Sequence, residues 1–304
     1  MSNITGHQDR ALLGIVLMLF AYLLFSFIDA SAKWLGLLGL PALQLAFMRY
    51  LAHFVISAGL VSLAGGGLRE FAPARLALVM CRGALLMGST VLNFFAVTYL
   101  PLTLTSTILF SAPIIICFLS WPLLGERVGI YRWSAIMLGF FGVVIAIRPF
   151  DDSFHWAVFL SLGGAACFAL YSILTRHLAG SVSVDVMQFW SGACGTFCLL
   201  PFAILVWQNP VTGFGWLVLV MLGFFGWSGH QLLTKAHNFA PASMLTPFGY
   251  SFILFLTIWS YVVFDHLPDK WTIVGAFIIV ASGLIIWFRE LVKSRYKDLH
   301  TAGL

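Results

Sequence analysis

The feature of this sequence that most limits its fold is a series of apolar segments, each about as long as a lipid bilayer is thick. A helix needs about 20 mostly apolar residues to cross about 30 Å of hydrocarbon. The chain is therefore predicted to be an all-α membrane protein with ten transmembrane helices. The apolar windows, bounded by glycine, proline or charge, lie at 11–28, 42–63, 76–97, 102–124, 130–147, 156–175, 186–206, 214–234, 242–264 and 272–288.

Composition excludes most other classes of protein. Of the 304 residues, 61% are hydrophobic and 9% are charged, against about 25% charged in an ordinary soluble domain. Little chain remains for a water-exposed catalytic domain or a nucleic-acid-binding module, so the net charge of +5 is no sign of nucleic-acid binding. We expect the partners to be the lipid bilayer and a small molecule, with no nucleic acid. The sequence does not indicate an oligomeric state.

The cysteines do not form a framework for disulfides or a metal. All five, Cys81, Cys117, Cys167, Cys194 and Cys198, fall within apolar runs, whereas disulfides belong in extracellular loops. Cys194 and Cys198 share a helix face, but no four-ligand pattern of Cys, His and carboxylate includes them. We therefore expect no metal and no cofactor. The first apolar run lacks an Ala-x-Ala cleavage pattern, so it is predicted to be a retained helix and not a signal peptide.

Basic residues predict the orientation in the membrane. Ten spans place both termini on one side. With the termini in the cytoplasm, eleven Lys and Arg residues fall in cytoplasmic loops, and three, Lys33, Arg148 and Lys270, fall outside. Positive residues accumulate in cytoplasmic loops, so we expect both the N-terminus and the C-terminus to be cytoplasmic.

Weak internal similarity divides the chain into two halves, residues 1–150 and 151–304. A shift of 140 residues places Leu100 to Thr103 over Ala240 to Ser243. A shift of 143 residues places Lys33 over Arg176. Because five is odd, a repeated five-helix unit enters the membrane from the opposite side the second time. Inverted repeats of this kind surround a central cavity and support alternating access.

The first half of the chain contains three short motifs. Lys33 follows Phe25 by eight residues, and Arg49 lies among small apolar residues in the second span. The fourth span has Pro101 at its start, Pro113 twelve residues later, and a Gly-Glu pair at 125–126 after it. These motifs resemble those of the EamA-like ten-helix members of the drug/metabolite transporter superfamily. In that family a Trp-Gly pair stands where this chain has Phe25 and Ser26.

The second half carries a related pattern. Pro241, Pro247 and Tyr250 resemble a subgroup motif, whereas Asp265 and His266 stand where the family has Gly-Glu. The resemblance implies a cavity lined by helices one to four and six to nine, with helices five and ten peripheral.

The resemblance also implies the function. We expect a secondary, non-ATP-driven transporter of the bacterial inner membrane that moves small metabolites, amino acids foremost, by alternating access and as an exporter. Nucleotide-like or vitamin metabolites are the alternative substrates. An intramembrane enzyme is a rival class, but the chain has no His-Glu-x-x-His, no Gly-x-Ser-x-Gly and no paired intramembrane aspartates. We therefore expect no enzymatic activity.

Charged and titratable side chains within the spans are candidates for the substrate site. An arginine at mid-membrane costs about 2.5 to 3.5 kcal/mol to insert, so it faces a cavity or a partner. Arg49, eight residues into the second span, binds either the carbonyls of a neighbouring helix or a substrate carboxylate. His53, on the same face, and His230, next to Gln231, either bond to backbone or couple transport to protons.

Aromatic rings beside small polar residues complete the predicted site. Aromatic faces attract an ammonium group, and hydroxyls bond a carboxylate, so a zwitterionic amino acid fits such a lining. Helix packing is the alternative role for each of these residues. They are Tyr22, Ser26, Tyr50, Phe110, Ser111, Trp190, Trp227, Tyr250 and Ser251.

Carboxylates are rare in the predicted spans. Asp29 stands four residues before Lys33, a spacing that predicts a local ion pair at the outer end of the first span. Without a carboxylate in the cavity, facilitated diffusion or exchange is favoured over proton or sodium coupling. Pro113 and Pro247 predict kinks in spans four and nine, with either a mechanical or a binding role.

Overall fold

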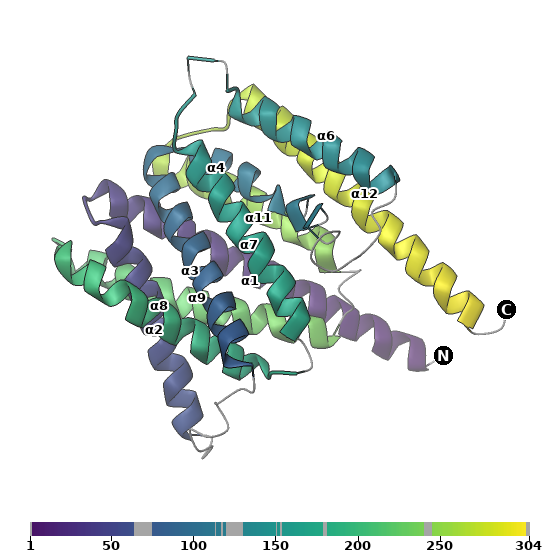
Figure 1. Ribbon diagram of the computed structural model, residues 1–304, viewed down its shortest axis with the longest axis horizontal. Coiled ribbons are helices and arrows are strands. Elements are labelled where there is room, and N and C mark those ends of the chain that lie inside the picture. The colour runs from purple at the N-terminus through teal and green to yellow at the C-terminus, as the bar shows by residue number, and fades with distance from the viewer. Residues whose placement is uncertain are drawn as a thin grey trace.

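The computed structural model describes residues 2–63, 75–112, 114–116, 118–119, 130–149, 151–152, 154–178, 181–239 and 245–301. This part of the chain contains helices and no strand. Both termini lie at the same end of the helix bundle (Figure 1), as an even number of spans requires.

The helices follow one another with short connections. In the first half they are α1 (Ser2–Leu37), α2 (Ala42–Leu63), α3 (Leu76–Tyr99), α4 (Leu102–Leu109) and α6 (Ile130–Ile147). In the second half they are α7 (Val158–Leu178), α8 (Val184–Leu205), α9 (Gly213–Phe239), the 3-10 helix η2 (Thr246–Tyr250), α11 (Ser251–Phe264) and α12 (Lys270–Thr301).

The ten predicted spans are confirmed. Within the described residues, six helices are long and apolar enough to cross a membrane, and four shorter apolar segments correspond to spans four, five, nine and ten. The end of the first span at residue 28 was predicted wrongly, because α1 continues to Leu37. The charges of Asp29 and Lys33 end the apolar window in the sequence, but both side chains bond to other helices, so the helix continues through them.

Spans four and nine are irregular at corresponding places. The regular turns of α4 stop at Leu109, where the Ser111 amide bonds to the Ile108 carbonyl in a tighter turn. In span nine, the 3-10 turns of η2 precede α11, with Pro247 near their start. Pro113 lies outside the described residues. Phe110 and Tyr250, at the two irregular points, have ring centroids 5.2 Å apart.

The pairing of the helices shows the repeat directly. α1 packs on α9 and α3 packs on α7, and these two pairs exchange when each helix is replaced by its counterpart in the other half. The pairs α2 with α8, α4 with α11, and α6 with α12 each map onto themselves. This is the pattern that a pseudo-twofold axis produces, so the fold is two inverted five-helix repeats.

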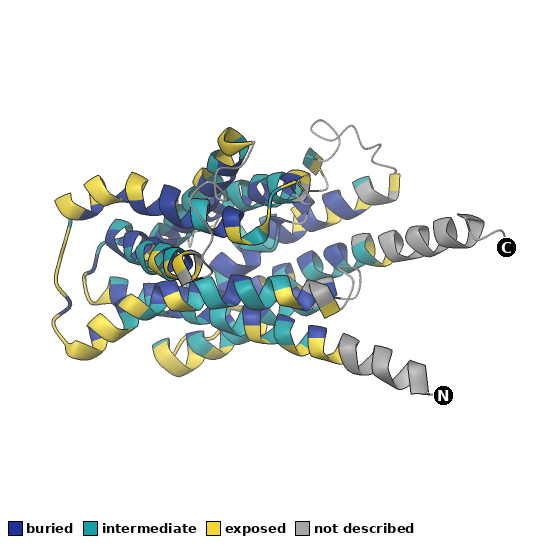
Figure 2. Cartoon of the chain, turned by 90° about the horizontal axis from the view of Figure 1, so that it is seen from below, coloured by how far each residue is buried: buried dark blue, intermediate teal, exposed yellow. Residues whose placement is uncertain are grey.

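Helices α6 and α12 lie side by side at the edge of the bundle (Figure 1), as predicted for spans five and ten. Glycines allow this close approach, since a Cβ atom on Gly275 would lie 2.6 Å from the Gly142 carbonyl oxygen. Small residues at such contacts are the usual means by which membrane helices pack. Large apolar side chains such as Phe140 and Phe277 are exposed, and the exposed residues lie along the outer helices and the ends of the bundle (Figure 2).

Five connections gather at the end of the bundle opposite the termini, which we call the Lys33 end. They contain residues 38–41, 100–101, 148–149 with 154–157, 206–212 and 265–269. Two of them are joined by an ion pair of 2.6 Å between Arg148 and Asp269. The connection 206–212 is joined to the first turn of α2, because the Gln44 side chain bonds to the backbone of Gln208 at 2.7 and 2.9 Å.

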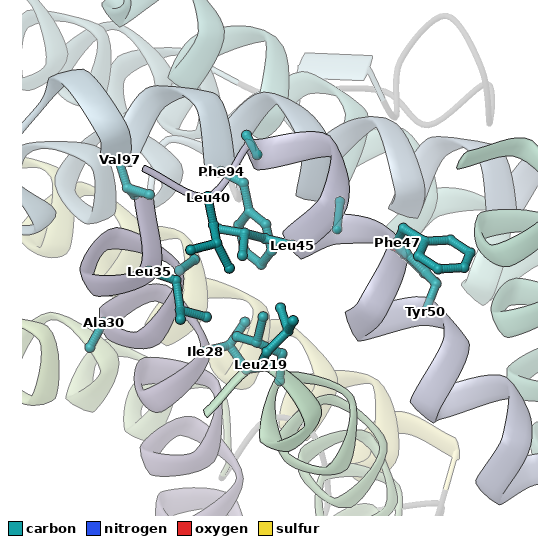
Figure 3. Close-up of a cluster of buried hydrophobic side chains, with 14 of the residues drawn as sticks. Ile28, Ala30, Leu35, Leu40, Leu45, Phe47, Tyr50, Phe94, Val97 and Leu219 are labelled. Atoms are coloured by element: carbon teal, nitrogen blue, oxygen red, sulfur yellow. The ribbon is translucent and has the colours of Figure 1, made fainter. Parts of the chain in front are cut away.

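A core of apolar side chains fills the bundle near the Lys33 end (Figure 3). Leu35, Leu40, Leu45 and Phe94 come from α1, the following connection, α2 and α3, and each is at most 6% exposed. Leu219 of α9 completes the cluster at 0% exposed. Together they close this end of the molecule.

Substituting Gly275 tests the contact between α6 and α12. Gly275→Leu places a side chain against the Gly142 carbonyl and Ala146, and overpacking of this kind costs about 1–3 kcal/mol. We expect a lower melting temperature in detergent. Gly59→Leu is the matched control, because no atom lies within 4 Å of a Cβ at that exposed helix position. Equal melting temperatures for the two variants would contradict the packing described here.

Candidate functional site

A cavity of about 230 Å³ lies in the middle of the bundle. Its wall is formed by residues of α1, α2, α3, α7, α9 and α11 and by the end of span four. Of the described residues, none from α8 contributes to it, which departs from the predicted lining by helix seven. Its polar side chains are Tyr22, Asp29, Arg49, Ser89, Thr90, Asn93, Tyr171 and His230.

Arg49 of α2 is held in the cavity wall by one hydroxyl group. Its guanidinium donates to Thr90 Oγ1 of α3. Thr90 donates its own proton to the Leu86 carbonyl at 3.0 Å, so the Tyr50 hydroxyl, 2.9 Å away, is the donor in its bond to Thr90. A guanidinium has five N–H donors. Thr90 takes one, and it is the one hydrogen-bond partner of the guanidinium among the described residues.

Asp29 of α1 faces the same cavity and is 7% exposed. Its Oδ1 accepts a 3.0 Å bond from the Asn93 amide of α3. The predicted pair with Lys33 is wrong, because the Lys33 amine donates to the carbonyls of Val97 at 3.0 Å and Leu100 at 2.7 Å. These carbonyls at the end of α3 have no helical partner further on, so they attract the ammonium.

Aromatic rings occupy much of the remaining wall. Phe25, one turn before Asp29 on α1, lies with its centroid 5.0 Å from the His230 ring. On the opposite side Phe168 and Tyr171 of α7 have centroids 5.7 Å apart. Phe110 lies 6.0 Å from Phe252, also between centroids. The further lining residues Ile28, Leu86, Phe94, Leu109, Ala112 and Leu233 are apolar or small.

The two histidines predicted for the site lie next to each other, one in the cavity wall and one behind it. The His230 ring lies 6.2 Å from the His53 ring, between centroids, and both residues are less than 10% exposed. The Nε2 atom of His53 is buried and has no hydrogen-bond partner in the described structure. His230 lines the cavity, whereas His53 lies beyond it.

Four of the predicted site residues therefore line the cavity: Tyr22, Arg49, Phe110 and His230. The structure brings them together from three helices and the end of span four. Their role in substrate binding stays a prediction.

The other predicted residues lie outside the lining. Tyr50 and His53 are buried behind Arg49. Ser26 is bonded to the Leu23 carbonyl and the Trp259 indole. Trp190 packs with the cluster around Val79 and Met187, and the Tyr250 hydroxyl lies against Gly283. The last four, Ser111, Trp227, Gln231 and Ser251, also fall outside the set of residues that line the cavity.

Sequence reasoning missed several lining residues. Ser89, Thr90 and Asn93 form a polar stripe on α3, at the three- and four-residue spacing of one helix face. That stripe was readable as polar side chains within an apolar window. Phe168 and Tyr171 carried no such signal, since aromatic residues are common throughout the chain.

Arg82 of α3 proves to be a structural cation. Its side chain is 3% exposed. It donates to Thr175 at 2.7 Å, Ser191 at 2.8 Å, Tyr171 at 2.8 Å and the Met187 carbonyl at 3.2 Å. These bonds join α3 to α7 and α8, and one of them orients the Tyr171 ring toward the cavity.

A larger hollow of about 510 Å³ lies between span four, α6 and α7. Its lining is apolar apart from Ser111, and its rim includes the exposed rings of Phe118, Phe140 and Phe159. None of its described lining residues carries a charge, and a few polar or charged groups are what orient a polar solute in a pocket. The smaller central cavity is therefore the candidate site.

An inverted ten-helix bundle around a polar cavity defines this chain as a membrane transporter. The sequence signature of the EamA-like transporter family matches residues 12–148 and again residues 155–288. The chain belongs to this family of multi-pass membrane proteins, within the drug/metabolite transporter superfamily.

Three relatives are similar over most of their length. The S-adenosylmethionine uptake transporter of Rickettsia felis is 27% identical, covering 86% of this chain and 88% of that protein. The riboflavin transporter of Vibrio cholerae is 29% identical, covering 95% and 97%. The pseudopaline exporter CntI of Pseudomonas aeruginosa is 26% identical, covering 88% and 94%. The three are named for different substrates, so the family alone does not specify one.

A solved crystal structure shares the fold. It superposes with a TM-score of 0.62 at 18% sequence identity and covers 91% of this chain and 96% of its own.

Neutralising Arg82 tests its structural role. Arg82→Gln removes donors from buried hydroxyls and a carbonyl, which we expect to destabilise the fold by about 3 kcal/mol. Melting in detergent measures this. Arg75→Gln is the control, because Arg75 starts the same helix but is exposed. A melting temperature unchanged by Arg82→Gln would show that the bonds contribute nothing to stability.

Proposed function

We propose that this chain transports small metabolites that carry a carboxylate, amino acids foremost, across the bacterial inner membrane by alternating access. The observation that carries the proposal is Arg49, a half-buried guanidinium that lines a mid-bundle cavity and has Thr90 as its one hydrogen-bond partner among the described residues. Arginine binds carboxylates in a forked geometry. Thr90 restricts the side chain to one orientation, which reduces the entropy lost when a ligand binds.

The size of the cavity favours amino acids over larger solutes. Pockets that hold drug-sized molecules measure about 300–1,000 Å³, and this one measures about 230 Å³. A flat vitamin or nucleoside derivative of the kind that the relatives are named for needs a wider cavity. Such metabolites remain the alternative, supported by the aromatic rings of Phe25, Phe110 and Phe168 that line the wall.

The two predicted halves, residues 1–150 and 151–304, are the moving parts in this proposal. With the termini in the cytoplasm, the Lys33 end faces outward and the apolar core around Leu35 and Phe94 closes the cavity to the outside. The cavity extends along α9 as far as Leu233, toward the other end. Facilitated diffusion without ion coupling then gives net export whenever the substrate is more concentrated in the cytoplasm.

Counterflow in proteoliposomes tests the function. Vesicles loaded with an unlabelled amino acid are expected to accumulate the same amino acid in labelled form, and to do so without a pH gradient. Riboflavin and S-adenosylmethionine serve as comparison substrates. Counterflow for either of them but for no amino acid would replace the proposed substrate class, and no counterflow for any would refute the assigned site.

Arg49 variants test the carboxylate contact. Arg49→Gln is expected to lower the apparent affinity for a transported amino acid about 10- to 100-fold, since one charge-assisted bond is worth about 1.5–3 kcal/mol. Arg49→Lys keeps the charge but loses the bidentate geometry of the guanidinium. Its affinity for the amino acid should therefore lie between those of the unmodified chain and Arg49→Gln. Arg148→Gln, at the Lys33 end, is the control. Equal affinities for Arg49→Gln and the control would exclude the contact.

A further inference from the structure

The Asp29 carboxylate has no structural use that accounts for its burial. It is 7% exposed within a membrane-spanning helix, and a buried ion costs several kcal/mol unless it is compensated. The only hydrogen bond recorded for it among the described residues is the one that its Oδ1 accepts from the neutral Asn93 amide. One bond to a neutral amide offsets only part of that cost.

The cations nearby do not pair with Asp29 directly. Lys33, one turn away, is committed to the carbonyls of Val97 and Leu100 and lies 5.7 Å from the Phe264 ring centroid. In the part of the chain that the structure describes, the ion pairs within 4 Å all involve Arg148. Arg49 lies in the wall of the same cavity as Asp29.

The cavity therefore has one negative and one positive group in a single small space. A molecule with both a carboxylate and an ammonium satisfies both. A monoanion leaves the Asp29 charge facing another negative charge, and a monocation leaves Arg49 without an anion. In a medium of low dielectric such mismatches are costly. Phe25, one turn before Asp29, adds an aromatic face that attracts a cation.

We propose that Asp29, held by Asn93, binds the ammonium group of the transported molecule and makes the cavity select zwitterions over monoanions of the same shape. This inference rests on the proposed function for the position of the substrate and names its charge class. Asp29 is then a specificity-determining residue, with Arg49 as its opposite pole.

Three ring-matched probes separate the charges: L-phenylalanine is a zwitterion, 3-phenylpropionate is a monoanion and phenethylamine is a monocation. Binding is measured on the purified full chain as protection against thermal unfolding. We expect L-phenylalanine to bind the unmodified chain most tightly. In Asp29→Asn, which keeps the shape and the Asn93 contact, affinity for L-phenylalanine should fall about 10- to 100-fold and that for 3-phenylpropionate should rise.

Two further variants act as controls. Asp265→Asn removes an exposed carboxylate at a left-handed backbone position that asparagine tolerates, and it should leave the order of the probes unchanged. Asn93→Ala keeps the Asp29 charge but frees its side chain, so affinity should fall without a change in that order.

The outcomes are distinct. An unchanged order of probes in Asp29→Asn, or protection of the unmodified chain by none of the three, overturns the inference. If Asp29→Asn abolishes accumulation driven by a proton or sodium gradient while the order of probes stays the same, Asp29 is an ion-coupling site and the inference is also overturned. If the probes show the expected order but no amino acid gives counterflow, the proposed function fails and the charge selection stands.

Discussion

A charge within hydrocarbon must be met by groups of the protein, and this requirement determines how the helices of this chain are joined. Arg82 donates hydrogen bonds to α7 and α8, and Lys33 donates hydrogen bonds to the carbonyls at the end of α3. Insertion of each such residue costs about 2.5 to 3.5 kcal/mol, so the bonds that offset this cost fix which helices lie together. Arg49 differs, because one hydroxyl is its recorded partner and a cavity lies beside it. Among the described cations, the same physical requirement thus separates Arg82 and Lys33, which join helices, from Arg49, which lines the cavity.

The helix pairs that map onto themselves or onto each other give alternating access a structural basis. In the proposed mechanism the two halves exchange conformations, and the contact of α1 with α9 then takes the form that α3 with α7 has now, and the reverse. At the Lys33 end, α1 is fastened to α3 by Lys33. The sequence places Arg176 of α7 at the corresponding position in the other half, at the opposite end of the bundle.

Much of the fold could be predicted because apolar length is a property of the sequence alone. The bounds of α2 and α6 agree with the predicted spans 42–63 and 130–147. The end of α1 could not be predicted, since the groups that bond to Asp29 and Lys33 lie in α3 and at its C-terminal end. In the site, Arg49 was identified because an isolated charge stands out in an apolar helix. Trp190 was wrongly predicted to line the cavity, because α8 packs behind α2. The sequence of α8 alone does not indicate which helix covers it. Tyr171 was missed because its orientation depends on Arg82.

The position of Asp29 changes the reason for expecting transport without ion coupling. The expectation from sequence relied on a cavity free of carboxylates, and Asp29 lines that cavity. In the proposed mechanism the empty cavity contains Asp29 and Arg49, which together carry no net charge, and a bound zwitterion adds none. The electrostatic cost of switching the cavity from one face of the membrane to the other is then similar with and without substrate. No proton or sodium ion is needed to balance the charge of the empty or the loaded cavity. Transport down the substrate gradient without ion coupling then follows from charge neutrality, and not from the absence of an acidic residue.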